Sequence, residues 1–160
     1  MLAFAIQNHA HRSGTHLGRK PVRRLAHDGS TFSRFGTSGK PGAVQTAAGC
    51  WAKLAFEFSP AGRPTIVSVV TKDTSDDANG PDIDAQQVYL RVYWDGTVFA
   101  FHYSLDGKSW SLVRLFALAV GECTPTIELT AQSPIGEGCL VSFGDVYWKA
   151  ETLSDLRDGS

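Results

Sequence analysis

Hydrophobic and polar residues alternate along the chain from residue 50 onward. In residues 50–58, the apolar Ala52, Leu54 and Phe56 fall on one side of an extended chain. The residues between them are mostly polar or amphipathic, and this period of two is typical of a strand with one buried face. Residues 64–72 carry β-branched side chains on both sides, which predicts a strand covered on both faces.

The same pattern predicts five more strands, separated by turn residues. Two Asp-Gly dipeptides, at 95–96 and 106–107, favour tight turns between consecutive antiparallel strands. Residues 73–85 are acidic and contain Gly and Pro, which predicts a loop. Residues 152–157 predict one helical turn, because Thr152 and Asp155 have capping-box spacing. The five strands are residues 86–94, 97–105, 110–118, 124–132 and 140–150.

Seven strands with almost no helix predict an all-β protein in which two antiparallel sheets cover each other as a β-sandwich. We assign residues 46–160 to this domain. Residues 1–45 differ, because they contain seven Lys or Arg against one acidic residue and show no regular period after residue 6. They are predicted to form a basic, poorly ordered leader.

Charge and cysteine content limit the functional classes. The chain has 15 basic and 16 acidic residues, so no strong overall field favours nucleic acid or an anionic membrane. The basic leader lacks the interleaved aromatics that stack on bases. Three cysteines without CxxC spacing argue against a disulfide framework and a zinc cluster, and the apolar run 2–6 is too short for a signal peptide. We therefore expect a cytoplasmic protein with no nucleic-acid or membrane partner.

Four motifs occur in a fixed order: Trp51 to Phe58, Val69-Val70-Thr71 with Ser75-Asp76 after it, Ser104 to Trp110, and Ser133 to Gly138. Together they resemble the regulation-of-enolase-like family of unknown function, within the concanavalin A-like lectin and glucanase superfamily. The resemblance covers about residues 47 to 150. It implies a jelly-roll β-sandwich and brings no catalytic residues that transfer to this chain.

The chain departs from this family at two places. Family members usually have ordered strands before the first motif, whereas this chain has the basic, aperiodic leader. The sandwich is therefore expected to lack ordered N-terminal strands. The residues Ser75-Asp76-Asp77-Ala78 also lack the aromatic that the family has after its second motif, which argues against an inherited ligand contact there.

The polar sides of three predicted strands supply a candidate ligand site. On a curved sheet these side chains would converge as an aromatic platform beside charged groups, which suits sugar rings and hydroxyls. The alternative is a solvated face with cross-strand pairs such as Arg91 with Glu57. The candidate ligand-binding residues are Trp51, Lys53, Glu57, Tyr89, Arg91, Tyr93 and His102.

Other chemistry has weaker support in the sequence. Glycoside hydrolysis needs two nearby carboxylates, but Glu57 and Glu128 lie on separate strands and the superfamily's paired-acid motif is absent. The acidic loop 73–84 lacks EF-hand spacing, so a solvated turn is favoured over a calcium site. His102 has no nucleophile with a spacing signature. No catalytic residue, metal site or cofactor is predicted.

These observations favour a non-catalytic binding module that recognises a carbohydrate or glycan-like ligand. The alternative is a protein-interaction or regulatory module that acts on a metabolic enzyme, as the family name suggests. A glycoside hydrolase is the third and weakest hypothesis.

Overall fold

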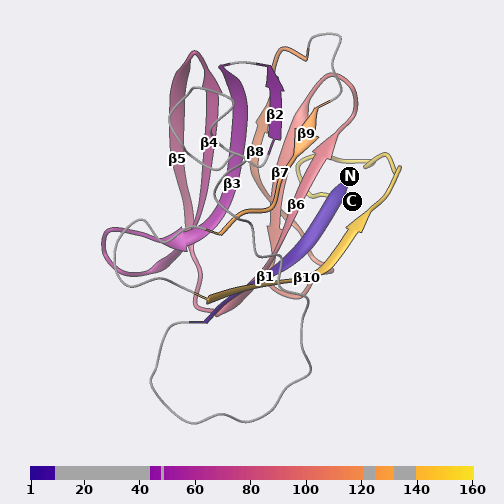
Figure 1. Cartoon of the computed structure of the whole chain (residues 1–160). Coiled ribbons are helices and arrows are strands. Elements are labelled where there is room, and N and C mark those ends of the chain that lie inside the picture. Colours follow the sequence, from indigo (N-terminus) through magenta and orange to yellow (C-terminus); the bar gives the residue numbers. More distant parts are fainter. Residues whose placement is uncertain (10–43, 48, 121–124, 132–139) are drawn as a thin grey trace.

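The computed structural model describes residues 1–9, 44–47, 49–120, 125–131 and 140–160. Within these residues the chain forms ten strands and no helix. The strands make two five-stranded sheets in which the paired neighbours run antiparallel (Figure 1). The prediction of an all-β, antiparallel protein is confirmed.

One sheet, here called sheet A, has the strand order β10-β1-β6-β7-β8. Its strands are β1 (Leu2–His9), β6 (Gln87–Trp94), β7 (Phe99–Ser104), β8 (Ser111–Phe116) and β10 (Leu140–Trp148). The other, sheet B, has the order β5-β4-β3-β2-β9. Its strands are β2 (Val44–Ala47), β3 (Cys50–Phe58), β4 (Pro64–Lys72), β5 (Thr74–Asp82) and β9 (Thr126–Ile127).

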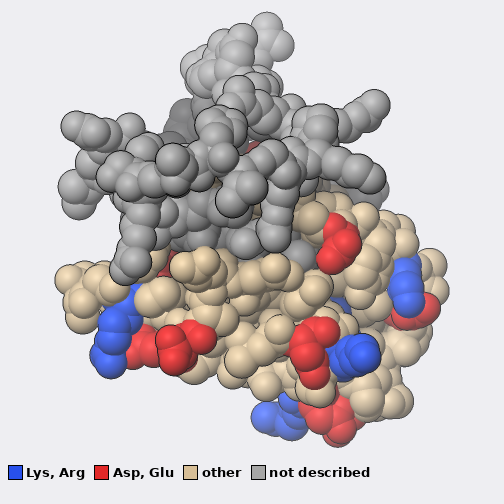
Figure 2. Space-filling view, turned by 90° about the horizontal axis from the view of Figure 1, so that it is seen from below, with Lys and Arg blue, Asp and Glu red and all other residues tan. Residues whose placement is uncertain are grey.

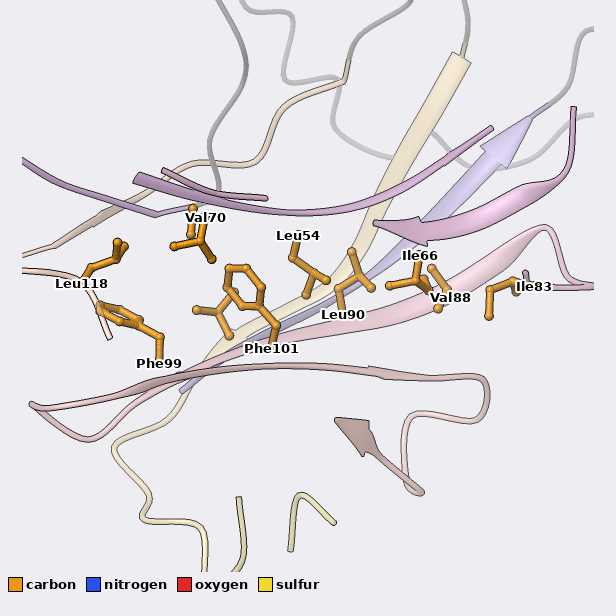
Figure 3. Close-up of a cluster of buried hydrophobic side chains, with 11 residues drawn as sticks. Leu54, Ile66, Val70, Ile83, Val88, Leu90, Phe99, Phe101 and Leu118 are labelled. Carbon is orange, nitrogen blue, oxygen red and sulfur yellow. The ribbon is translucent and has the colours of Figure 1, made fainter. Parts of the chain in front are cut away.

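The hydrophobic core lies between the two sheets (Figure 3). Phe99 and Phe101 of β7 are almost fully buried there, and Phe116 of β8 packs against both rings. Burying one such side chain contributes about 1.5 to 3 kcal/mol, so this layer is a major source of stability. The remaining buried members come mainly from β3, β4 and β6: Ala52, Leu54, Ile66, Val70, Ile83, Val88, Leu90, Val92 and Leu118.

The first nine residues contradict one expectation. Strand β1 lies inside sheet A, paired with β6 on one side and β10 on the other. Met1 and Lys149 also exchange two hydrogen bonds of 2.8 Å. The expected lack of ordered N-terminal strands is therefore wrong for residues 2–9, which pair with partners at least 80 residues away in sequence. Residues 44 and 45 of the predicted leader lie in strand β2, and residues 10–43 lie outside the described residues.

The acidic segment after β4 also differs from its prediction. Thr74–Asp82 forms the edge strand β5, paired antiparallel with β4, instead of a loop. Nearly all of its residues are exposed, so neither face is apolar, and this explains why the sequence shows no strand pattern. Charged residues on an edge strand also discourage pairing with another chain. Among the described residues, no group of three or more His, Cys, Asp or Glu could hold a metal ion.

The other predicted strands agree with the structure at differing lengths. Those expected at 50–58 and 64–72 have the predicted bounds, and four more are found within a few residues of them. The strand predicted at 124–132 is reduced to Thr126–Ile127 among the described residues. Residues 152–157 form no helix and lead into a turn. Figure 2 shows acidic and basic side chains interspersed over the described part of one face.

Candidate functional site

The seven predicted ligand-binding residues lie on two opposite outer faces of the molecule. Trp51, Lys53 and Glu57 project from β3 on the outer face of sheet B, because the residues between them face the core. Tyr89, Arg91 and Tyr93 project from β6 on the outer face of sheet A for the same reason, and His102 is the cross-strand partner of Arg91. The two groups therefore do not converge, and the structure offers two separate candidate sites.

The outer face of sheet B has an aromatic residue beside hydroxyl groups. Trp51 is half-buried, and its cross-strand neighbour is Thr71, which in turn pairs with Ser75 of edge strand β5. The Thr71 and Ser75 hydroxyl oxygens lie 2.9 Å apart in a hydrogen bond. One row across three strands thus carries an indole ring followed by two hydroxyls. We call this row the Trp51 face.

Charged and amide groups lie next to this row. The Lys53 ammonium donates to the Glu57 carboxylate at 2.9 Å along the same strand. Exposed pairs of this kind contribute only about 0.2 to 1 kcal/mol, so the pair can open to meet a ligand at low cost. The hypothetical pair of Arg91 with Glu57 is not formed, because these residues lie on different sheets. Exposed Asp77 and Asn79 of β5 project from the same outer face.

Residues 153–160 cover part of the outer face of sheet A, over strands β6 and β7. Tyr93 and Ala100 are buried here together with Met1, and three leucines, Leu112, Leu153 and Leu156, pack against them. The apolar part of the C-terminal segment thus closes over strands β6 and β7. Tyr93 is a packing residue and does not face solvent.

Arg91 lies under this segment with only 3% of its surface exposed. Its Nη2 donates to the carbonyl oxygen of Gly159 at 2.8 Å, and its guanidinium lies 4.2 Å from the centre of the Trp110 ring. Burial lowers the pKa of Arg91 to about 10, so the side chain is still charged at neutral pH. Its Nε has no hydrogen-bond partner in the described structure.

His102 is fully buried beside Arg91. Its Nε2 lies 2.8 Å from the Leu156 carbonyl oxygen, which can only accept, so Nε2 carries the proton. Burial lowers the pKa of His102 to about 4, with the Arg91 charge acting in the same direction and Leu156 and Asp158 opposing it. The ring is therefore neutral at physiological pH and joins sheet A to the C-terminal segment.

Tyr89 packs against the turn that follows β7. A side chain at Gly107, where φ is +73°, would meet the Tyr89 ring at 3.3 Å. Asp106 holds this turn by accepting the backbone N–H groups of Lys108 and Ser109, both at 2.8 Å, and these bonds lower the pKa of its carboxyl. The Asp-Gly motif is thus explained as a turn that covers Tyr89.

Sequence reasoning missed the residues that cover Arg91 and His102. Neither Trp110 nor Gly159 carries a local signal of its role, because both contact Arg91 from distant positions in the sequence, 68 residues away for Gly159. The capping-box spacing of Thr152 and Asp155 indicated a helical turn, whereas Leu153 and Leu156 pack on sheet A from a non-helical segment.

The family model described as protein of unknown function (DUF1349) matches residues 43–151. The chain belongs to this family. The DUF1349 match contains strands β2 to β10 and all seven predicted ligand-binding residues, while β1 and residues 153–160 lie outside it. The described part of this DUF1349 protein has no helix with the length and apolar character needed to cross a bilayer.

A solved structure with a similar fold covers most of the length of the chain. It is described as the crystal structure of a functionally unknown protein from Saccharomyces cerevisiae. The TM-score is 0.63 at 21% identity, over 94% of this chain and 69% of that chain. At this identity the similarity shows the fold alone. No curated protein matches this member of the DUF1349 family.

Proposed function

We propose that the protein is a non-catalytic, concanavalin A-like binding module that recognises a carbohydrate or glycan-like ligand on the Trp51 face. The observation that carries the proposal is the row of Trp51, Thr71 and Ser75 across three adjacent strands. Jelly-roll connectivity and a place in the regulation-of-enolase-like family are part of the proposal. Two antiparallel sheets around a common core support them.

The chemistry of this face suits a sugar. An indole ring offers a flat apolar surface to the C–H groups of a pyranose, while neighbouring polar groups exchange hydrogen bonds with its hydroxyls. Strands in a sheet lie about 4.8 Å apart, so the row from Trp51 to Ser75 spans roughly 10 Å. Lys53 and Asp77 add a donor and an acceptor at the next register position.

A glycan-array screen of the full chain tests this function. We expect wild-type protein to bind a subset of glycans and Trp51→Ala to lose that binding while its melting temperature stays near the wild-type value. Trp148→Ala is the matched control, because Trp148 is a 64% exposed tryptophan on the other sheet. Equal losses in both variants, or no binding by wild type with and without calcium, would refute the proposal.

A second candidate function is protein interaction or regulation of a metabolic enzyme. It is favoured by exposed apolar side chains on edge strand β10, where Leu140, Val146 and Trp148 are all more than half exposed. Clusters of exposed apolar residues mark interaction surfaces. If this function is correct, Val146→Asp with Trp148→Asp abolishes complex formation with the enzyme and Trp51→Ala does not.

A further inference from the structure

Within the described part of the chain, Arg91 is a buried cation without an anionic partner. Among the described residues, no carboxylate lies within ion-pair distance of its guanidinium. Buried charged side chains are almost always paired, because removing a charge from water is costly. The guanidinium instead donates a hydrogen bond to the neutral carbonyl of Gly159 and packs against the ring of Trp110. In the arrangement seen here, the positive charge of Arg91 is therefore not balanced by a negative charge within ion-pair distance.

The hydrogen bonds of Arg91 show which group would compensate it. Nε and Nη2 lie on one edge of the guanidinium plane and form a two-pronged donor that matches the two oxygens of a carboxylate. The Gly159 carbonyl has a single oxygen, which takes Nη2 and leaves Nε unpaired. The C-terminal segment thus uses one of two neighbouring donors, and the pair of donors has the geometry that suits a carboxylate.

We propose that Arg91 anchors a binding site for a carboxylate ligand on the outer face of sheet A, and that the C-terminal segment closes this site through Gly159. Trp110 holds the guanidinium plane in place from one side, so the donor edge is oriented before a ligand arrives. The ligand is a small molecule with a free carboxylate, either an acidic sugar or a simple hydroxy acid.

The contacts of the C-terminal segment indicate how the site opens. Leu153 and Leu156 pack on sheet A, whereas Arg157, Asp158 and Ser160 are exposed. The turn that carries Gly159 is held mainly by its own backbone, through a bond from Gly159 N to Asp155 O of 2.9 Å. Displacement of residues 157–160 breaks the bond to Arg91, while Leu153 and Leu156 keep their packing on sheet A. It also moves the Asp158 carboxylate, which would repel an incoming anion.

Gly159 provides a variant that opens the site. Its φ is +74°, and a Cβ at this position would overlap Arg91 Nη2 and lie 2.8 Å from the Trp110 Cβ. Gly159→Ala therefore prevents closure on Arg91. Gly62→Ala is the matched control, because Gly62 has a φ of +73° and nothing within 4 Å of the added Cβ.

The experiment follows the Arg91 Nε–H signal by NMR in the full chain. The probes are sodium glucuronate and sodium lactate, with glucose and sodium chloride as controls for a neutral sugar and for ionic strength. We expect a saturable shift with a carboxylate and none with the controls. Gly159→Ala should bind roughly tenfold more tightly, because closed molecules no longer compete with the ligand. Gly62→Ala and Trp51→Ala should bind like wild type.

Comparison of the glucuronate and lactate probes distinguishes acidic sugars from simple hydroxy acids as the ligand. A response to glucuronate alone assigns the site to acidic sugars, and a response to both probes assigns it to small carboxylates in general. Arg91→Lys removes the two-pronged donor and should weaken binding about tenfold, as followed by the Trp110 indole N–H. No saturable shift in either wild type or Gly159→Ala would overturn the proposal, as would unchanged affinity in Arg91→Lys. Unchanged binding in Trp51→Ala separates this site from the Trp51 face.

Discussion

His102 donates its Nε2 hydrogen to the carbonyl oxygen of Leu156 at 2.8 Å, although the two residues are 54 positions apart. This bond lies under the C-terminal segment and connects strand β7 to it. Because burial of the ring favours its neutral form, the stability of the protein depends on pH.

The free energy of unfolding should fall as the pH is lowered from about 6.5 to about 4. The pKa of His102 is lowered to about 4 in the folded protein from 6.5. The unfolded chain thus binds the proton first, and the stabilisation present above pH 6.5 is lost on acidification. The loss is about 3 kcal/mol at most. Urea denaturation at several pH values measures it.

The control for this pH effect is His102→Gln, which keeps a side-chain N–H donor and has no titratable ring. This variant should lose the pH dependence between 4 and 6.5. The same slope in the variant and in wild type would assign the effect to other groups.

Gly159→Ala should destabilise the protein more than Gly62→Ala. A non-glycine residue at positive φ costs about 1 to 2 kcal/mol at either position. Only Gly159→Ala also breaks the bond from Arg91, because its Cβ overlaps the guanidinium. Chemical denaturation of both variants gives the difference, and equal losses would mean that closure on Arg91 adds no stability.

Phe101→Ala should reduce the free energy of unfolding by about 3 to 5 kcal/mol. Phe101 is fully buried between the sheets and packs edge to face on Phe116 at 4.8 Å. Phe58→Ala, at a phenylalanine that is 51% exposed, should cost less than about 1 kcal/mol. Similar losses at both positions would contradict the assignment of the core.

Residues 43–160 expressed alone should not fold cooperatively. This fragment contains the whole family match but lacks β1, which pairs with both β6 and β10 inside sheet A. Its removal leaves β10 without a neighbouring strand and β6 paired only with β7, so backbone groups of both strands lose their partners. Circular dichroism and thermal unfolding test this, and addition of a peptide of residues 1–9 should restore part of the transition. A melting temperature equal to that of the full chain would show that β1 is dispensable.

The sequence predicted the strands whose faces differ in polarity, and also the strand at 64–72, which is apolar and β-branched on both faces. Residues 50–58 show the difference in polarity well, because one side packs in the core and the other faces out. Strand β5 was missed because it is exposed on both faces, and β1 was missed because its pairing partners are distant in sequence.

The candidate site was predicted only in part. Alternation correctly assigned Trp51 and Arg91 to the outer sides of their strands, but period-two patterns do not specify which sheet a strand joins. The seven residues therefore divide between two faces. The burial of His102 depends on residues 153–160, and no local pattern at His102 could have indicated that cover.

Trp51 and Arg91 lie on opposite sides of two stacked sheets, so the molecule would be bivalent if both proposed sites bind their ligands. Stacked sheets lie about 10 Å apart, so ligands on the two outer faces would be separated by the full thickness of the protein. Neither ligand would block the other, and both could belong to one large molecule only if that molecule wrapped around an edge. Two separate ligands, one on each face, would be cross-linked by a single copy of the chain.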